Sequence, residues 1–501
     1  MQTITLNRFD GGIVNDPRNP SESVSRYTGN FDILTDRNRM SPYRSSEDGH
    51  DNQATEKLQN FCVALRTGTT YSLYGLGVVS GGGIAQVQFK NLTTGATIDL
   101  DDNNWNKGGN SSSSAGSTSF NLFVYYAKTG YIYGARANTH IWRYDPSGVG
   151  AWVDTHQALT YTNIAQGIVH SKDYILYSPY DNKIAKNDNG SWTTTALTLP
   201  SHLYITSICE YGNYIAIGCA PLSGIGNSRV FIWDRDTSLA TLSDTIDWGQ
   251  EDLKVLEEVD GALIGISLSG NNTTRFTNRI IFRQLSISSA VQFMELFSGS
   301  TTTLPIAKQR TTNRLFFMLS GTFNGTTREG VWSVGRTSPT SPFSIVHERT
   351  PNNDTALTGG VLRGFFSIGD YMFISYVDNS VEVMSKTNDT EAYAVSGIRE
   401  TTINQGMPGE DTYRKKKLYA IGVNYEAIPT SGEVKLELRV DNGSWNTVLT
   451  DSTVGSRFLE MAALSSGTAF TDGREFEFRI SSKGTKITSL SYRYDILKTL
   501  V

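Results

Sequence analysis

One sequence motif recurs along this chain and constrains its fold more than any other feature. An apolar strand opens after a turn, a loop of small residues follows, and a second apolar strand closes on a charged residue. The clearest copy spans residues 210–236, EYGNYIAIGCAPLSGIGNSRVFIWDRD. The turns that open the copies lie near Gly68, Gly130, Asp173, Gly212, Asp260, Asn313 and Asp370.

The spacing of these copies predicts the architecture. Self-similar units at a period of roughly 40–50 residues are typical of propellers and solenoids, and loop insertions account for the longer intervals. Units made only of strands favour the propeller, in which sheets stack around an axis because no sheet buries both faces alone. We therefore predict a β-propeller of about seven blades. An irregular series of β-hairpins in two or three sandwiches is the alternative.

The rest of the chain predicts an all-β protein in three parts. The 47 glycines suit a chain dense in turns, and long runs with a helical apolar period are absent. Residues 1–58, with several X-Pro pairs and few strand patterns, predict an extended N-terminal arm. Residues 59–404 hold the repeats. Residues 405–501 show strict apolar alternation, as in VKLELRV at 434–440, and predict a small β-sandwich-like domain.

Charge and cysteine content narrow the classes of function. A net charge of −5 argues against a general nucleic-acid binder, although it is compatible with DNA that passes through a pore. The chain lacks an apolar run of 18 residues, so we expect no membrane insertion. Cys62, Cys209 and Cys219 are too few for a disulfide framework, which favours buried free thiols and synthesis in a reducing cytoplasm.

No sequence motif indicates catalysis. The motif Asp-Asn-Gly-Ser-Trp occurs at 188–192 and again at 441–445. It is one residue shorter than the Asp box of sialidase-like propellers. We expect a β-turn with a packed tryptophan at each. The six histidines stand far apart, and no phosphate-binding glycine motif is present. We therefore expect no enzyme activity, no metal and no cofactor.

The sharpest charge cluster is Arg414, Lys415, Lys416 and Lys417. It would bind DNA phosphate or an acidic patch on a partner ring. The alternative is a solvated segment that leads into a strand.

Short motifs in the arm resemble a known family. Phe9-Asp10-Gly11-Gly12-Ile13 is followed by Asn30-Phe31-Asp32-Ile33 and then by Pro42-Tyr43-Arg44, ahead of the strand repeat. This order is similar to the tail nozzle family of short-tailed bacteriophages, also called tail tubular protein B or tail hub proteins. The residues that we expect at a subunit interface are Phe9, Gly11, Gly12, Ile13, Asn30, Phe31 and Tyr43.

The resemblance implies a structural protein of the virion tail, synthesised in the host cytoplasm. Members of this family assemble as a sixfold ring beneath the adaptor, and genomic DNA leaves through the lumen. The expected partners are other copies of the chain, the adaptor or another portal-side tail protein, and DNA in transit. Tail fibres are a further candidate.

Two other functions stay open at this point. A propeller-based tail-tip protein that binds a host receptor or glycan predicts an exposed aromatic cluster on one rim. A carbohydrate-active hydrolase predicts a pocket on the propeller axis with two carboxylates roughly 5–9.5 Å apart.

Overall fold

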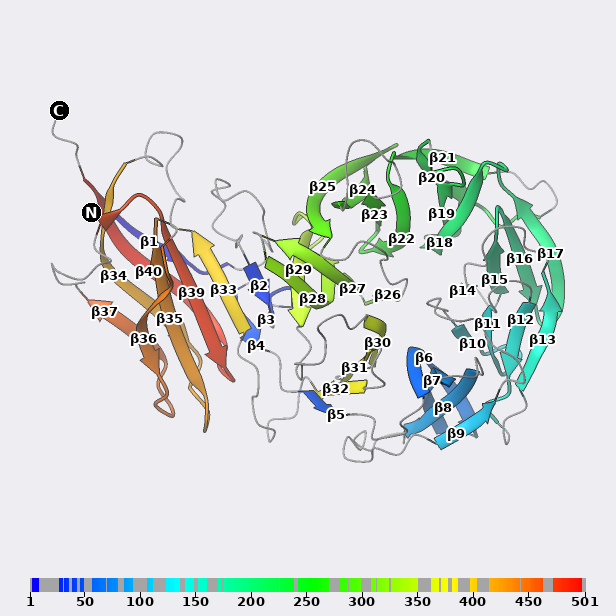
Figure 1. The fold of residues 1–501 in the computed structure, drawn as a ribbon, viewed down its shortest axis with the longest axis horizontal. Helices are drawn as coiled ribbons and strands as arrows, with labels where there is room; N and C mark the ends of the chain where they lie inside the picture. The colour runs from blue at the N-terminus through cyan, green and yellow to red at the C-terminus, as the bar shows by residue number, and fades with distance from the viewer. Residues whose placement is uncertain are drawn as a thin grey trace. The chain divides into compact units, whose positions relative to one another are not determined.

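The computed structural model is built of β-strands (Figure 1) and resolves into two compact units. The propeller unit comprises Glu47–Gly321 and Asn353–Met384, and the sandwich unit comprises Met1–Ser46, Thr322–Asn352 and Ser385–Val501. The structure describes residues 2–8, 27–29, 31–35, 38–42, 46–48, 56–68, 70–79, 85–92, 106–110, 123–135, 140–147, 152–159, 170–172, 175–224, 226–237, 242–269, 279–286, 288–298, 308–311, 313–323, 326–349, 362–368, 371–376, 381–385, 397–402, 414–441, 443–462 and 472–497.

The first half of the propeller unit consists of four-stranded antiparallel sheets formed by consecutive strands. The first sheet contains β6 (Glu56–Thr67), β7 (Thr70–Val79), β8 (Ala85–Leu92) and β9 (Asn106–Asn110). The second contains β10 (Phe123–Tyr126), β11 (Tyr131–Ala135), β12 (His140–Tyr144) and β13 (Trp152–Ala158). The third contains β14 (His170–Lys172), β15 (Ile175–Tyr180), β16 (Lys183–Asp188) and β17 (Ser191–Thr198).

The second half continues the same plan and ends with a strand borrowed from the arm. The fourth sheet contains β18 (Leu203–Tyr211), β19 (Tyr214–Pro221), β20 (Ser228–Trp233) and β21 (Leu242–Gly249). The next strands are β22 (Asp252–Val259), β23 (Ala262–Ser269), β24 (Arg279–Ser286) and β25 (Ser289–Ser298), followed by the pair β26 (Lys308–Arg310) and β27 (Arg314–Phe323). The last sheet contains β30 (Leu362–Ile368), β31 (Tyr371–Tyr376), β32 (Val381–Ser385) and β5 (Ser46–Asp48).

The first strands of these sheets close a ring. Each one contacts the first strand of the next sheet, in the order β6, β10, β14, β18, β22, β26 and β30, and β30 contacts β6 again. Figure 1 shows the sheets following one another around this ring. The strand β5 precedes β6 in the chain but pairs with β32, so one sheet contains both ends of the propeller sequence. The predicted all-β propeller of about seven blades is confirmed.

The repeated motif corresponds to one hairpin in each blade. The predicted turns at Gly68, Gly130, Gly212, Asp260 and Asn313 all lie between the first and second strands of a blade. Those at Asp173 and Asp370 lie outside the described residues, but the strands on either side of them pair in the same way. The motif therefore covers the second and third strands of each blade, and its opening turn joins the innermost strand to the second.

Two glycines in second strands are required by tryptophan packing. Gly134 pairs with Trp142 across β11 and β12, and a Cβ on Gly134 would lie 2.2 Å from the indole. A Cβ on Gly265 would lie 2.4 Å from the indole of Trp248. Both tryptophans are fully buried, so larger residues at these glycines would overpack the blades.

The sandwich unit contains two groups of strands around one core, and their pairings are antiparallel except that β2 runs parallel to β29. One sheet contains β1 (Gln2–Leu6), β40 (Ile487–Ile496), β34 (Lys416–Tyr425) and β37 (Phe458–Ala462), and β38 (Asp472–Gly473) also pairs with β34. The other group runs in the order β28 (Thr326–Gly335), β29 (Ser344–Arg349), β2 (Tyr27–Gly29), β33 (Gly397–Thr402), β39 (Phe476–Lys483), β35 (Glu433–Val440) and β36 (Asn446–Asp451).

The core of this unit follows the apolar alternation of the sequence. Val434, Leu436 and Leu438 on β35 face Phe478 and Ile480 on β39, and all five are buried. Strand β40 contributes Leu490, Tyr492 and Tyr494 from the opposing sheet. The β-sandwich-like fold predicted for the C-terminal residues is present.

The arm is a structural part of this unit, and the unit bounds differ from the predicted domains for that reason. β1 pairs with β40, and β2 lies between β29 and β33. Strands β28, β29 and β33, which fall within the predicted propeller range 59–404, therefore belong to the sandwich unit. The long-range pairing of β2 with strands of residues 344–402 could not be read from local patterns.

The connection from β36 to β37 contains a network of hydrogen bonds to the Asp451 carboxylate. Tyr425 donates a hydrogen bond to Asp451 Oδ2 at 2.7 Å, and the Thr453 amide donates to Asp451 Oδ1 at 2.8 Å. Burial by itself raises the pKa of Asp451, but hydrogen bonds from Ser456, Tyr425 and Thr453 outweigh it and lower the pKa to about 2. Burial raises the pKa of Tyr425 to about 12, and the Asp451 carboxylate adds to this effect.

We predict that Asp451→Asn lowers the free energy of unfolding of the sandwich unit by about 1 kcal/mol at neutral pH. A carboxyl whose folded pKa is depressed stabilises the fold above its unfolded pKa, and this contribution is lost as the pH falls toward 2. Wild type and Asp451→Asn should therefore converge between pH 5 and pH 2 in thermal melts followed by calorimetry. Glu433→Gln, at an exposed carboxylate, is the control. A constant difference across this range would contradict the prediction.

Candidate functional site

Most of the predicted arm interface falls outside the described residues. This applies to Phe9, Gly11, Gly12, Ile13, Asn30 and Tyr43. Phe31 lies in β3 (Phe31–Asp32), which pairs with β4 (Ser41–Pro42). The neighbouring Ile33 and Leu34 are 0% and 1% exposed and belong to the sandwich core. The second arm motif thus anchors the chain to its own fold.

The predicted charge cluster lies at the start of β34, and its four side chains differ in exposure. Arg414 and Lys415 are exposed, but Lys416 is only 2% exposed and donates a hydrogen bond to the Arg474 carbonyl at 2.8 Å. Lys417 pairs in register with Asp495 on one side and with Asp472 on the other. The four cations therefore do not form one exposed patch.

Acidic residues on the first strands of blades four and five are matched by cations. Glu257 lies 2.9 Å from Lys308, and Arg310 lies 3.9 Å from Glu258 and 4.0 Å from Glu210. The Gly212 amide also donates to Glu258 at 3.0 Å. These carboxylates join neighbouring blades, and each has a cation nearby.

The repeated Asp-Asn-Gly-Ser-Trp motif forms turns, as predicted. Asn189 and Gly190, with φ of 53° and 89°, connect β16 to β17 in a two-residue hairpin. Trp192 beyond this turn packs against Tyr133 and His156. In the second copy Asn442 lies outside the described residues, and the indole of Trp445 lies 4.7 Å from Arg439 and 4.1 Å from Arg479.

Other candidate chemistry is limited in the part of the chain that the structure describes. All three cysteines are free and buried, and burial raises the pKa of each thiol. Within these residues, no three His, Cys, Asp or Glu side chains are grouped to hold a metal ion. The same residues contain no helix that is long and apolar enough to span a membrane.

Among the described residues of the propeller unit, the most exposed aromatic side chains belong to different blades. Tyr71 is 47% exposed at the start of β7, and Tyr214 is 41% exposed at the start of β19. These strands are in the first and fourth sheets. The two tyrosines are therefore separate features of the propeller.

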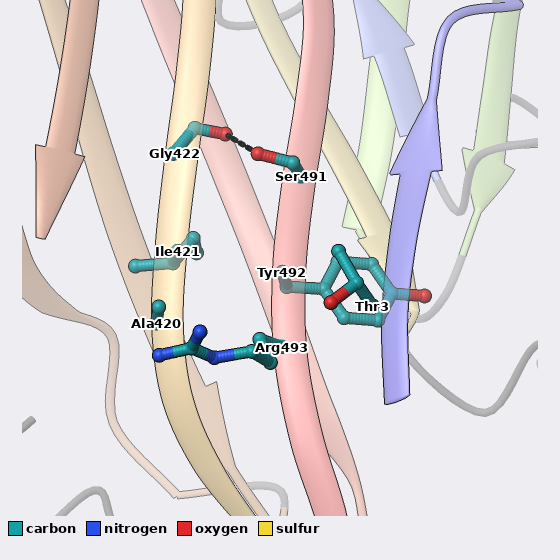
Figure 2. Close-up of a pocket in the computed structure, with 7 residues that line it drawn as sticks. All are labelled: Thr3, Ala420, Ile421, Gly422, Ser491, Tyr492 and Arg493. Carbon is teal, nitrogen blue, oxygen red and sulfur yellow. Dashed lines mark hydrogen bonds between the residues drawn. The ribbon is translucent and has the colours of Figure 1, made fainter. Parts of the chain in front are cut away.

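A groove lined by an arginine, by hydroxyl side chains and by small residues lies on the sandwich unit. It has a volume of about 150 Å³ and is lined by Thr3, Ala420, Ile421, Gly422, Ser491, Tyr492 and Arg493. Figure 2 shows these residues on three adjacent strands, β1, β40 and β34. We call this feature the Arg493 groove.

The strand registers explain the shape of the Arg493 groove. Arg493 on β40 lies opposite Thr3 on β1 and opposite Ala420 on β34. One step along the same face, Ser491 lies opposite Gly422 and donates a hydrogen bond to its carbonyl at 3.4 Å. Ile421 and Tyr492 are buried in the core, so small residues form the floor of the groove.

Sequence patterns place only two residues of this site, Ser491 and Arg493, on a common face. The alternation of residues 487–496 puts Ser491 and Arg493 on the outward face of one strand, a position at which exposed residues are expected. Thr3 and Ala420 reach the same place through pairings between segments far apart in the chain. No local signal could have identified that combination.

Comparisons with known proteins show similarity in fold only. No family model matches the chain, and no curated protein matches it. Among solved structures, virginiamycin B lyase from Staphylococcus aureus has a TM-score of 0.43 at 10% identity, over 68% of this chain and 99% of the lyase. The β-propeller domain of Cps50 (Swd1) from Myceliophteria thermophila has a TM-score of 0.42 at 10% identity, over 68% and 99% of the two chains. BamB from Moraxella catarrhalis has a TM-score of 0.36 at 12% identity, over 70% and 98%. These TM-scores lie below 0.5, so the propeller assignment rests on the strand pairing and ring closure described above.

Proposed function

We propose that this protein is a structural subunit of the tail nozzle of a short-tailed bacteriophage, through which genomic DNA leaves the virion. The observation that carries the proposal is that one chain combines the arm motifs with a closed propeller and a second, sandwich-like unit. This is the architecture that the resemblance implies. In this role the protein acts mechanically and needs no catalytic group.

Ion pairs and hydrogen bonds between neighbouring blades support a mechanical role. Lys308 on β26 is paired with Glu257 on β22 and also donates to the Ile208 carbonyl on β18. Gln309 on β26 donates to the Ser367 carbonyl on β30 at 2.6 Å and accepts from the Ser367 amide. Polar contacts across blades on first strands resist relative movement of the sheets, as a conduit wall requires.

The proposed assembly is a closed ring of this chain. A closed ring requires a heterologous interface, in which two different surfaces of each subunit meet. The arm around Phe9 to Ile13 is the proposed first surface. The net charge of −5 favours a lumen to which DNA does not adhere.

The test is the solution mass of the full chain and of a variant in which residues 9–26 are replaced by a Gly/Ser linker of equal length. This replacement keeps β1 and β2. The proposal expects about six subunits of 55.1 kDa for the wild type and a monomer for the variant, with equal melting temperatures. Measurement with the purified adaptor ring covers the case in which assembly needs a template. A wild-type monomer that neither self-associates nor binds this ring would overturn the proposal.

A further inference from the structure

We infer that the Arg493 groove binds a small hydroxylated carboxylate, the chemistry of a sugar acid or a hydroxy acid. This inference is independent of the nozzle proposal. It concerns a ligand site on the sandwich unit and requires neither a ring nor DNA.

Arg493 is accessible to a ligand. Arg493 is exposed, and its guanidinium has no hydrogen bond or ion pair to any residue that the structure describes. Figure 2 shows its side chain extending from β40 toward Ala420. A guanidinium presents two parallel N–H groups in a fixed plane, and this fork matches the two oxygens of a carboxylate.

The charge balance at the groove favours a monoanion. Arg493 is the one cation among the residues that line it. A single positive charge matches a monoanion such as a carboxylate better than a phosphate dianion, which proteins usually hold with several donors. Asp495, the next residue on this face of β40, lies opposite Lys417 in the strand register, so a cation already faces it.

Two residues with hydroxyl groups, Ser491 and Thr3, line the groove beside Arg493. Because Ser491 Oγ donates its proton to the Gly422 carbonyl, its lone pairs are left to accept a hydrogen bond from a ligand hydroxyl. Thr3 is exposed on the other side of Arg493 and can both donate and accept. These groups favour a carboxylate that also carries hydroxyls.

The volume of the groove limits the size of the ligand. The small side chains of Ala420 and Gly422 leave a hollow of about 150 Å³ between larger neighbours. A cavity of about 150 Å³ accommodates a ligand the size of one six-membered ring. The groove therefore suits a single sugar acid, whose ring hydroxyls would face Ser491 and Thr3.

The experiment is titration of the full-length protein with D-glucuronate, monitored by saturation-transfer NMR and calorimetry. D-glucose tests the need for the carboxylate, and acetate tests the need for the hydroxyls. We expect saturable binding of glucuronate, weaker binding of acetate and none of glucose. Arg493→Gln should weaken glucuronate binding at least tenfold, and Arg457→Gln, at an exposed arginine on another strand connection, should leave it unchanged.

Two further variants separate ligand binding from folding. Ser491→Ala should weaken glucuronate but leave acetate unaffected, and Ala420→Leu should block both by filling the groove with Arg493 in place. Absence of glucuronate binding, or equal binding by wild type and Arg493→Gln, overturns the inference. If Arg493→Gln instead lowers the solution mass and glucuronate does not bind, the guanidinium pairs with an acidic side chain of another copy, which also overturns it. The nozzle proposal is tested by the arm replacement and does not depend on these results.

Discussion

Deletion of residues 1–48 will abolish cooperative folding of the sandwich unit and will leave the seventh blade of the propeller unit without its fourth strand. The deleted segment contains β1 to β4, which belong to the sandwich unit, and β5, which pairs with β32. β1 is an edge strand, but β2 lies inside its sheet, between β29 and β33. Its removal leaves β29 and β33 with one partner strand each and turns both into edge strands.

The energy of the lost contacts is as large as the stability of a typical domain. Leu6, Ile33, Leu34 and Met40 are between 0% and 1% exposed in the sandwich core. Burial of one such side chain stabilises a fold by about 1.5–3 kcal/mol, so the four contribute about 6–12 kcal/mol. Domains are stable by about 5–15 kcal/mol in total, so the truncated unit should not remain folded.

The measurement is calorimetry combined with limited proteolysis of the truncated and full-length chains. We expect the transition of the sandwich unit to disappear and residues 414–497 to become sensitive to protease. The linker replacement of residues 9–26 is the matched control, because it retains all described strands of the arm. A truncated chain with both transitions at their original temperatures would disprove this role of the arm.

This result bears on how the proposed ring can be tested. Loss of assembly after truncation would follow from unfolding alone, whether or not the arm forms the interface. Replacement of residues 9–26 changes Phe9, Gly11, Gly12 and Ile13 while Leu6 and Ile33 stay in place. Only the second design assigns a change in mass to the interface.

The sequence predicted best those features that local patterns specify. Turn residues such as Gly68 and Gly212 have positive φ in the structure, and they mark the hairpins of the propeller. Alternation in residues 434–440 correctly predicted which side chains of β35 face the core. Both signals act within about ten residues, so neighbouring sequence is sufficient to reveal them.

The features that sequence patterns missed depend on distant partners. Asn106–Asn110 contains no apolar residue that would indicate a strand, but it forms β9 because its backbone pairs with β8. Lys416 looked like one member of an exposed basic cluster, yet the Arg474 region of the chain covers it. Arg493 had no motif around it, and only the pairing of β1, β40 and β34 gives it neighbours with which to form a site.

Lys308→Met will lower the free energy of unfolding of the propeller unit by about 3 kcal/mol. The Lys308 and Glu257 side chains are 12% and 11% exposed and lie 2.9 Å apart. The ammonium also donates to the carbonyls of Leu256 and Ile208 and to Ser207 Oγ. Methionine preserves the length of the side chain but removes the ammonium from a nearly buried carboxylate and from two carbonyls.

The matched control is Lys128→Met, which removes an ion pair of similar length at the surface. Lys128 lies 2.6 Å from Asp188 on the neighbouring blade, but the two side chains are 37% and 49% exposed. Water replaces the lost partner there, so we expect no measurable change in urea unfolding followed by tryptophan fluorescence. Burial, rather than the presence of an ion pair, determines the difference between the two variants.

A double variant distinguishes loss of a charge partner from loss of packing. If the cost of Lys308→Met arises from the unpaired Glu257 carboxylate, Glu257→Gln in the same chain should recover part of the stability, and the two changes will not add. Additive losses would place the cost in the contacts with the Leu256 and Ile208 carbonyls. A loss no larger than that of Lys128→Met would show that the ties between blades four, five and six do not depend on this lysine.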